Sequence, residues 1–173
     1  MTDRWTITLM GENQSLILET LSDIIAQYQG NWLDSRLAQM DGKFVGIVSA
    51  SIPKSHSGKL QDELESFADS RDIVMLVTIN GHTKKDNIPL FKIKITAHDR
   101  KGIVLSISKI LRQQALNVRE FNTHCDSAPF AGQQLFTAEL VLEISEKEKD
   151  ILLQSIEALG DDFMVDTENL SLD

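Results

Sequence analysis

The residues best suited to binding chemistry form a short charged turn, Asp99-Arg100-Lys101-Gly102, placed directly before Ile103. Apolar residues at helical spacing begin at Ile103, so the turn leads into a helix whose first backbone N–H groups lack partners within that helix. Such a helix start, with its dipole, suits an anion such as a carboxylate. The turn can also be read as a solvated connection in which Asp99 caps the helix, and the residues alone favour that reading over a ligand site.

Two asparagines place polar side chains at matching points of the chain. Asn117-Val118 opens a strand after the helix that begins at Ile103, and Asn31 opens the corresponding strand in the first half. The amide oxygen of asparagine accepts a hydrogen bond from an ammonium group, but asparagine also commonly ends a helix connection or starts a turn. The segment Asp34-Ser35-Arg36 also has two readings. It contacts a ligand or partner, or it lies on a solvated face of the strand.

Catalysis and metal binding have no candidate residues. The four histidines, His56, His82, His98 and His124, share no ligand spacing. Cys125 follows His124, but neighbouring strand residues point to opposite faces, so the pair should not form an activated thiolate. We therefore expect a protein that is not an enzyme and that holds neither a cofactor nor a metal.

An internal repeat predicts how these residues are positioned. Identical residues recur 86 positions apart, as between Asn31 and Asn117; the others are Ile7 and Ile93, Ile17 and Ile103, Ser22 and Ser108, Ile24 and Ile110, and Gln27 and Gln113. The repeat predicts two domains, 1–80 and 89–173, joined by a polar linker at 81–88. Interfaces between such similar surfaces are natural places for a ligand or a partner.

Each half shows the pattern of a strand, a helix, two strands, a helix and a strand. In the first half we expect strands at 6–10, from Asn31 to about 40, at 44–52 and at 73–79. Asp41-Gly42 should form a two-residue hairpin, and Pro53 to Gly58 should form a loop before the second helix. The first helix should stop near Gly30.

The second half repeats this order with a longer hairpin loop, from Asp126 to Gln133. We expect strands at 91–97, from Asn117, at 136–144 and at 163–168. One helix should bury Ile103, Ile107, Ile110 and Leu111, and the other is marked by Leu152, Ser155, Ile156 and Leu159. Both halves are thus α+β, ferredoxin-like βαββαβ units, with an antiparallel sheet and helices on one face.

Composition excludes several classes of partner. The formal charge is −9, with 17 basic and 26 acidic residues, and the basic residues are scattered, so direct binding of nucleic acid is not expected. The longest apolar run, Ile73 to Val77, is far too short for a membrane span, and the start of the chain lacks the pattern of a signal peptide. A single cysteine fits the reducing cytoplasm.

Two motifs carry a resemblance to a known family. The segment from Ile95 to Val104 resembles the opening of an ACT domain, with Lys101 in place of the usual proline. Asn31-Trp32-Leu33-Asp34-Ser35-Arg36-Leu37-Ala38-Gln39-Met40 is similar to the strand signature of the glycine cleavage system transcriptional repressor family. The first turn departs from the pattern, because Asn13-Gln14-Ser15-Leu16 stands where the second half has Asp99 to Gly102.

The resemblance implies two tandem ACT domains that bind a small amino acid such as glycine. The ligand-binding residues it implies are Asp99, Arg100, Lys101, Gly102, Ile103, Asn117 and Val118, with Asn13 and Asn31 at the equivalent places of the first half. The N–H groups of Gly102 and Ile103 would hold the carboxylate, and Asn117 the ammonium. Leucine at position 16 makes ligand binding at the first turn less favourable.

The resemblance also implies a partner protein. The chain would bind a DNA-binding transcription activator of glycine-cleavage genes and hold it inactive, with glycine or a related amino acid modulating the complex. An alternative is an amino-acid-sensing regulatory subunit of a metabolic enzyme. A scaffold that binds no ligand and a homo-oligomer both remain open, since unpaired sheet edges can join within the chain or between chains.

Overall fold

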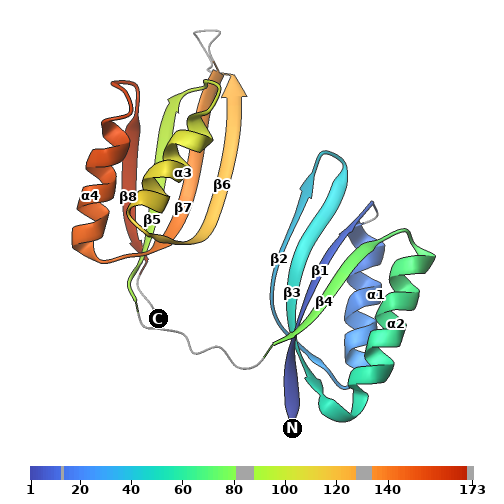
Figure 1. Ribbon diagram of the computed structural model, residues 1–173. Coiled ribbons are helices and arrows are strands. Elements are labelled where there is room, and N and C mark those ends of the chain that lie inside the picture. Colours follow the sequence, from blue (N-terminus) through green and yellow to red (C-terminus); the bar gives the residue numbers. More distant parts are fainter. Residues whose placement is uncertain (13, 81–87, 128–133, 171–173) are drawn as a thin grey trace. The chain divides into compact units, whose positions relative to one another are not determined.

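The computed structural model describes residues 1–12, 14–80, 88–127 and 134–170, which divide into two compact units, Met1–Lys85 and Asp86–Asp173 (Figure 1). The first unit contains β1 (Thr2–Gly11), α1 (Gln14–Gln27), β2 (Asn31–Met40), β3 (Lys43–Pro53), the 3-10 turn η1 (Lys54–His56), α2 (Ser57–Ser70) and β4 (Val74–Asn80). The second contains β5 (Leu90–His98), α3 (Ile103–Gln113), β6 (Asn117–Ser127), β7 (Gln134–Glu143), α4 (Glu146–Glu157) and β8 (Met164–Leu170).

Each unit is one four-stranded antiparallel sheet with both helices on one face (Figure 1). The strand orders are β2-β3-β1-β4 and β6-β7-β5-β8, so the first strand of each unit lies inside the sheet and the last strand forms an edge. This is the ferredoxin-like arrangement expected from the element order. The face away from the helices, which we call the open face, carries the alternate residues of every strand.

The repeat in the sequence corresponds to matching hydrophobic cores in the two units. Residues 86 positions apart are buried in both units, and the pairs are Ile7 and Ile93, Leu9 and Ile95, Ile17 and Ile103, Leu21 and Ile107, Ile24 and Ile110, and Ile25 and Leu111. Backbone irregularities recur at the same spacing, since Gln29 and Ala115 are both left-handed, with φ of 57° and 52°. Each edge strand β2 and β6 also contains a bulge, after Trp32 and after Val118.

Several local predictions are confirmed. Asp41 and Gly42 both have positive φ, as a tight two-residue hairpin turn requires. The expected stripe of Ile103, Ile107, Ile110 and Leu111 is the buried face of α3. Leu152 and Ile156 form the buried face of α4.

Other boundaries differ from the expected ones. Pro53 ends β3, and α2 begins at Ser57, so most of the loop expected from Pro53 to Gly58 is regular structure. This connection is tied to distant backbone, because Lys54 N–H donates to Met1 O at 3.2 Å and His56 Nδ1 donates to Tyr28 O at 2.8 Å. Asp126 belongs to β6, and residues 128–133 of the expected hairpin loop lie outside the described residues, as do 81–87 of the expected linker.

Candidate functional site

The turn from Asp99 to Gly102 joins the end of β5 to the start of α3, as expected. Gly102 is left-handed, with φ of 84° and ψ of 9°, and an added Cβ would meet no atom within 4 Å. Glycine is therefore favoured here by its backbone conformation and not by lack of space. The N–H of Ile103 donates to Arg100 O at 3.2 Å, which engages one of the two donors expected for a carboxylate. Gly102 N–H has no hydrogen-bond partner among the described residues.

Arg100 holds the turn against the connection between α4 and β8. Its Nη1 lies 3.3 Å from Asp162 Oδ1, its Nη2 donates to Leu159 O at 3.2 Å, and its guanidinium carbon lies 4.8 Å from the centre of the Phe163 ring. Asp162 Oδ2 also accepts the His98 N–H at 3.0 Å, and this hydrogen bond, with the charge of Arg100, lowers the pKa of Asp162. These contacts give Arg100 a positioning role.

The remaining members of the turn are exposed. Asp99 N–H donates to Gln134 O at 2.9 Å, so β7 fixes the start of the turn, and Lys101 is open to solvent. Partial desolvation and then the Asp99 carboxylate raise the pKa of the Cys125 thiol, which disfavours a reactive thiolate. His124 pairs instead with Asp126 at 2.9 Å, on the opposite face of β6 from Cys125.

Asn117 lies at the other end of the sheet from this turn. It pairs with Glu143, which also pairs with Leu90 at the start of β5, whereas the turn follows His98 at the end of β5. Eight residue steps along a strand are about 27 Å. One unit therefore does not bring Asn117 and its neighbour Val118 together with the turn.

The Asn117 side chain has its own ionic surroundings. Its Nδ2 donates to one carboxylate oxygen of Glu143, and Arg119 donates to the other oxygen. The Glu143 side chain is only 7% exposed, and the hydrogen bond from Arg119 lowers its pKa. Arg119 occupies the bulge of β6 and reaches Glu143 at the end of the neighbouring strand β7. Sequence reasoning missed both Arg119 and Glu143, since their meeting depends on the pairing of strands far apart in the sequence.

The described residues of the first unit form no equivalent turn. α1 begins at Gln14, three residues earlier in the repeat than α3, so Leu16 is helical where the second unit has its left-handed glycine. Asn13 lies outside the described residues, and Asn31 pairs with Ser51 at the opposite end of the sheet. The exposed Asp34 carboxylate contacts Arg36 at 3.4 Å and accepts the Ser35 N–H at 2.8 Å.

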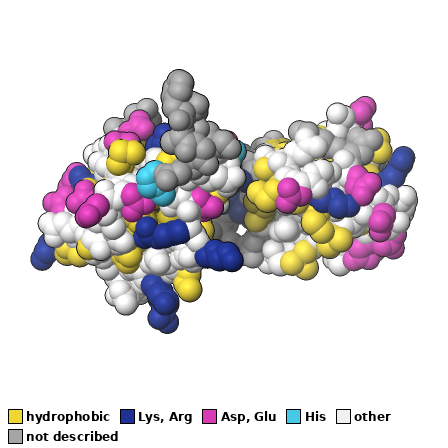
Figure 2. Space-filling view, turned by 90° about the horizontal axis from the view of Figure 1, so that it is seen from above, with side chains coloured by type: hydrophobic (Ala, Val, Ile, Leu, Met, Phe, Trp, Pro, Cys, Tyr) yellow, Lys and Arg dark blue, Asp and Glu magenta, His cyan; other side chains and the backbone are white. Residues whose placement is uncertain are grey.

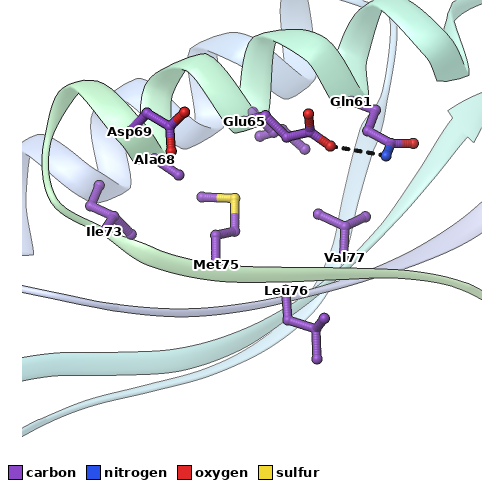
Figure 3. A pocket seen from close by; sticks show the side chains of 9 residues that line it. Gln61, Glu65, Ala68, Asp69, Ile73, Met75, Leu76 and Val77 are labelled. Carbon is purple, nitrogen blue, oxygen red and sulfur yellow. Dashed lines mark hydrogen bonds between the residues drawn. The ribbon is translucent and has the colours of Figure 1, made fainter.

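Two of the hollows in the described part of the first unit lie beside its sheet. One, of about 410 Å³, is beside its first turn and is bordered by the ion pair of Glu12 and Lys43, whose atoms lie 2.6 Å apart. This pair lowers the pKa of Glu12 and raises that of Lys43. The other, of about 460 Å³, lies between α2 and the edge strand β4 (Figure 3). The sequence analysis did not anticipate either hollow.

Among the described ranges, no group of three or more histidine, cysteine, aspartate or glutamate side chains is arranged to hold a metal ion. Within the same ranges, none of the helices has the length and apolar character needed to cross a membrane.

Comparison with known proteins agrees with this architecture. Residues 5–84 match the family model of the ACT domain. No curated protein sequence matches the chain. A solved structure titled as an unknown protein from Galdieria sulphuraria is 20% identical, with a TM-score of 0.84, and the match covers 99% of this chain and 100% of that one.

A second solved structure, titled "putative glycine cleavage system transcriptional repressor", is 14% identical, with a TM-score of 0.73 and coverage of 99% of both chains. At these identities both solved structures establish similarity of fold across the two units.

Proposed function

Because the chain contains an ACT domain over residues 5–84 and repeats its strand order in the second unit, we propose that it is a regulatory protein that acts through protein contact. It binds a DNA-binding transcription activator and holds it inactive, and glycine or a related amino acid modulates the complex. The observation that carries this proposal is the ACT domain whose strand β2 has the repressor-like signature Asn31 to Met40. The two-unit fold shared with the protein titled as a putative repressor supports it.

The charge of the protein fits a regulator that leaves DNA binding to its partner. A net charge of −9 repels the phosphate backbone, and none of the helices in the described ranges is a recognition helix in a basic setting. We place the protein in the cytoplasm, where a single unpaired cysteine stays reduced.

The amino acid binds at the turn before α3. Its carboxylate accepts the Gly102 N–H near the positive end of the α3 dipole, while Arg100 keeps the turn in place. An amino acid of this size cannot also reach Asn117, about 27 Å away along the sheet. A ligand that uses both groups must take the turn from one copy of the second unit and Asn117 from another copy.

The edge strand β6 offers a route to such a pair. Two β6 strands related by a twofold axis run antiparallel, so Asn117 at the start of one strand approaches the end of the sheet that holds the turn of its partner. Ligand binding and self-association are then linked, and each strengthens the other.

Calorimetry with glycine and the other common amino acids tests the site. Gly102→Leu, which places in this turn the residue type that the first unit has, should weaken binding at least tenfold, and Asn117→Ala should weaken both ligand binding and ligand-dependent dimerisation. Gly58→Leu is the matched control, because an added Cβ at Gly58 also meets open space. Undiminished binding by Gly102→Leu would remove this turn from the site, and unchanged dimerisation in Asn117→Ala would remove the paired arrangement.

The partner is tested by cross-linking in cells followed by identification of the captured proteins. A transcription activator recovered in a glycine-dependent manner supports the proposal. A metabolic enzyme recovered in its place would establish the alternative, a regulatory subunit that shares the ligand but not the target.

A further inference from the structure

The edge strand β4 of the first unit is unusual because it lacks the charges that normally protect a sheet edge. Its seven residues, Val74 to Asn80, include no acidic or basic side chain. Val74, Leu76 and Ile79 are 65%, 63% and 52% exposed. Natural proteins usually place charged residues on such an edge, since its unpaired backbone N–H and C=O groups can bind another strand.

The second unit provides an internal comparison. At the register positions where β4 has Leu76 and Thr78, the edge strand β8 has Asp166 and Glu168. The open faces differ in the same way, because the exposed Ile47 and Leu76 of the first unit stand where the second unit has Glu139 and Asp166. In the view from above, hydrophobic side chains gather on the first unit beside charged ones (Figure 2). The second unit thus shows that this fold can carry charged residues on its last edge strand, whereas β4 of the first unit lacks them.

Both faces of β4 present surfaces to a strand placed alongside it. Met75 and Val77 point toward α2 and form the floor of the 460 Å³ hollow between α2 and β4, which we call the groove. Leu76 points the opposite way, onto the open face (Figure 3). Val74 also lies on the open face, beside Met10 of β1. Since side chains alternate along a strand, an added strand would place one set in the groove and the other set against Val74 and Leu76.

The groove is acidic along its helical wall. Glu65 and Asp69 line it, and the Glu65 carboxylate accepts one hydrogen bond, from Gln61 at 3.0 Å. α2 as a whole carries four acidic residues and one lysine. Lysine side chains fit this groove because their aliphatic stems cover Met75 and Val77 while their ammonium groups reach the carboxylates.

We propose that β4 binds an extended segment of a partner protein by strand addition, with apolar side chains on the open face and basic side chains in the groove. This inference names a contact surface for the partner in the proposed function, and it rests on that function only for the existence of a partner. A second copy of the chain is a poorer occupant. Antiparallel pairing of two β4 strands would place the acidic α2 helices of both copies side by side on one face of the joined sheet, where their carboxylates repel each other.

Fluorescence anisotropy with the full chain and a synthetic peptide tests the proposal. The probe is a fluorescein-labelled peptide, Val-Lys-Val-Lys-Val-Lys-Val, with blocked ends. One control peptide has Glu in place of Lys, and a second keeps the Lys side chains but has alternate backbone nitrogens methylated. We expect each control to bind at least tenfold more weakly than the probe, because the first loses charge complementarity and the second loses backbone donors.

Matched variants locate the site. Leu76→Asp, which introduces the residue that β8 has at this register, should weaken peptide binding at least tenfold. Ile47→Glu introduces the residue that β7 has on the same open face, but two strands away from β4, and it should leave the affinity unchanged. The tryptophan emission of each variant checks that the first unit remains folded.

Three results would overturn the proposal. They are equal binding of the Glu peptide, retained binding by Leu76→Asp, and a dimer in sedimentation equilibrium that Leu76→Asp dissolves, which would assign β4 to a second copy. Peptide binding is measured without amino acid, whereas the ligand site is tested by glycine calorimetry. A failure of strand addition is therefore distinguishable from a failure of the proposed function.

Discussion

Replacing two glycines by alanine should have opposite effects on the stabilities of the two units. Gly102→Ala should destabilise the second unit, and Gly58→Ala should stabilise the first. Neither effect comes from packing, because an added Cβ meets no atom within 4 Å at either position. The two sites differ in backbone conformation, since Gly102 has φ of 84° and Gly58 lies inside helix α2.

The magnitudes follow from this difference. A residue with a Cβ in the left-handed region costs about 1–2 kcal/mol. The smaller entropy of the unfolded alanine chain offsets about 0.4–1 kcal/mol of that cost, which leaves a net destabilisation of about 1 kcal/mol for Gly102→Ala. In α2 the same substitution removes the helix penalty of glycine and gains roughly 0.5 kcal/mol. A change of about 1 kcal/mol shifts the Tm of a domain of this size by about 4–8 °C.

The assay can follow the units separately because both tryptophans, Trp5 and Trp32, lie in the first unit. Thermal unfolding by tryptophan fluorescence reports that unit, and circular dichroism reports both. Gly102→Ala should lower the Tm of the component seen only by circular dichroism, and Gly58→Ala should raise the Tm seen by fluorescence. A neutral or stabilising Gly102→Ala would refute the left-handed turn on which the ligand site depends.

Three further outcomes are expected. Ser145→Ala should lower the stability of the second unit by about 1 kcal/mol in denaturant unfolding, because it removes the capping box at the start of α4. The hydrogen bond from Arg119 lowers the pKa of Glu143 below its ordinary 4.5. The pair therefore stabilises the fold above pH 4.5, and its contribution is lost as the pH falls through the lowered pKa. Carboxyl NMR titration should show the Glu143 pKa rising in Arg119→Ala. Cys125 should react with iodoacetamide at pH 7.5 more slowly than a free thiol, and Asp99→Asn should speed this reaction, as measured by mass spectrometry.

The fold could be predicted from the sequence because its signals are local and repeated. The buried stripe of α3 follows from helical spacing, and the hairpin at Asp41 follows from the residue types of a tight turn. The start of α2 at Ser57 was missed, since the segment before it is held by the distant backbone groups of Met1 and Tyr28. No local pattern encodes such contacts.

The candidate site was less predictable for the same physical reason. The turn and Asn117 are 15 residues apart at their nearest, but α3 and the direction of β6 carry them to opposite ends of the sheet. Likewise, the sequence of the charged turn does not predict the hydrogen bond from Arg100 to Asp162, because Asp162 lies far along the chain. Residue types indicated which groups can bind, and strand register decided which of them meet.

The strand order of the first unit also constrains how the protein can be made. β1 emerges from the ribosome before the other strands of its unit, yet one of its two edges stays unpaired until β4, the last strand of the unit, has been synthesised. Ile73, Met75 and Val77 contribute to the core only at that point. Translation must therefore reach residue 80 before the first unit can close, and nascent chains that stop earlier expose a central strand to aggregation and to proteases.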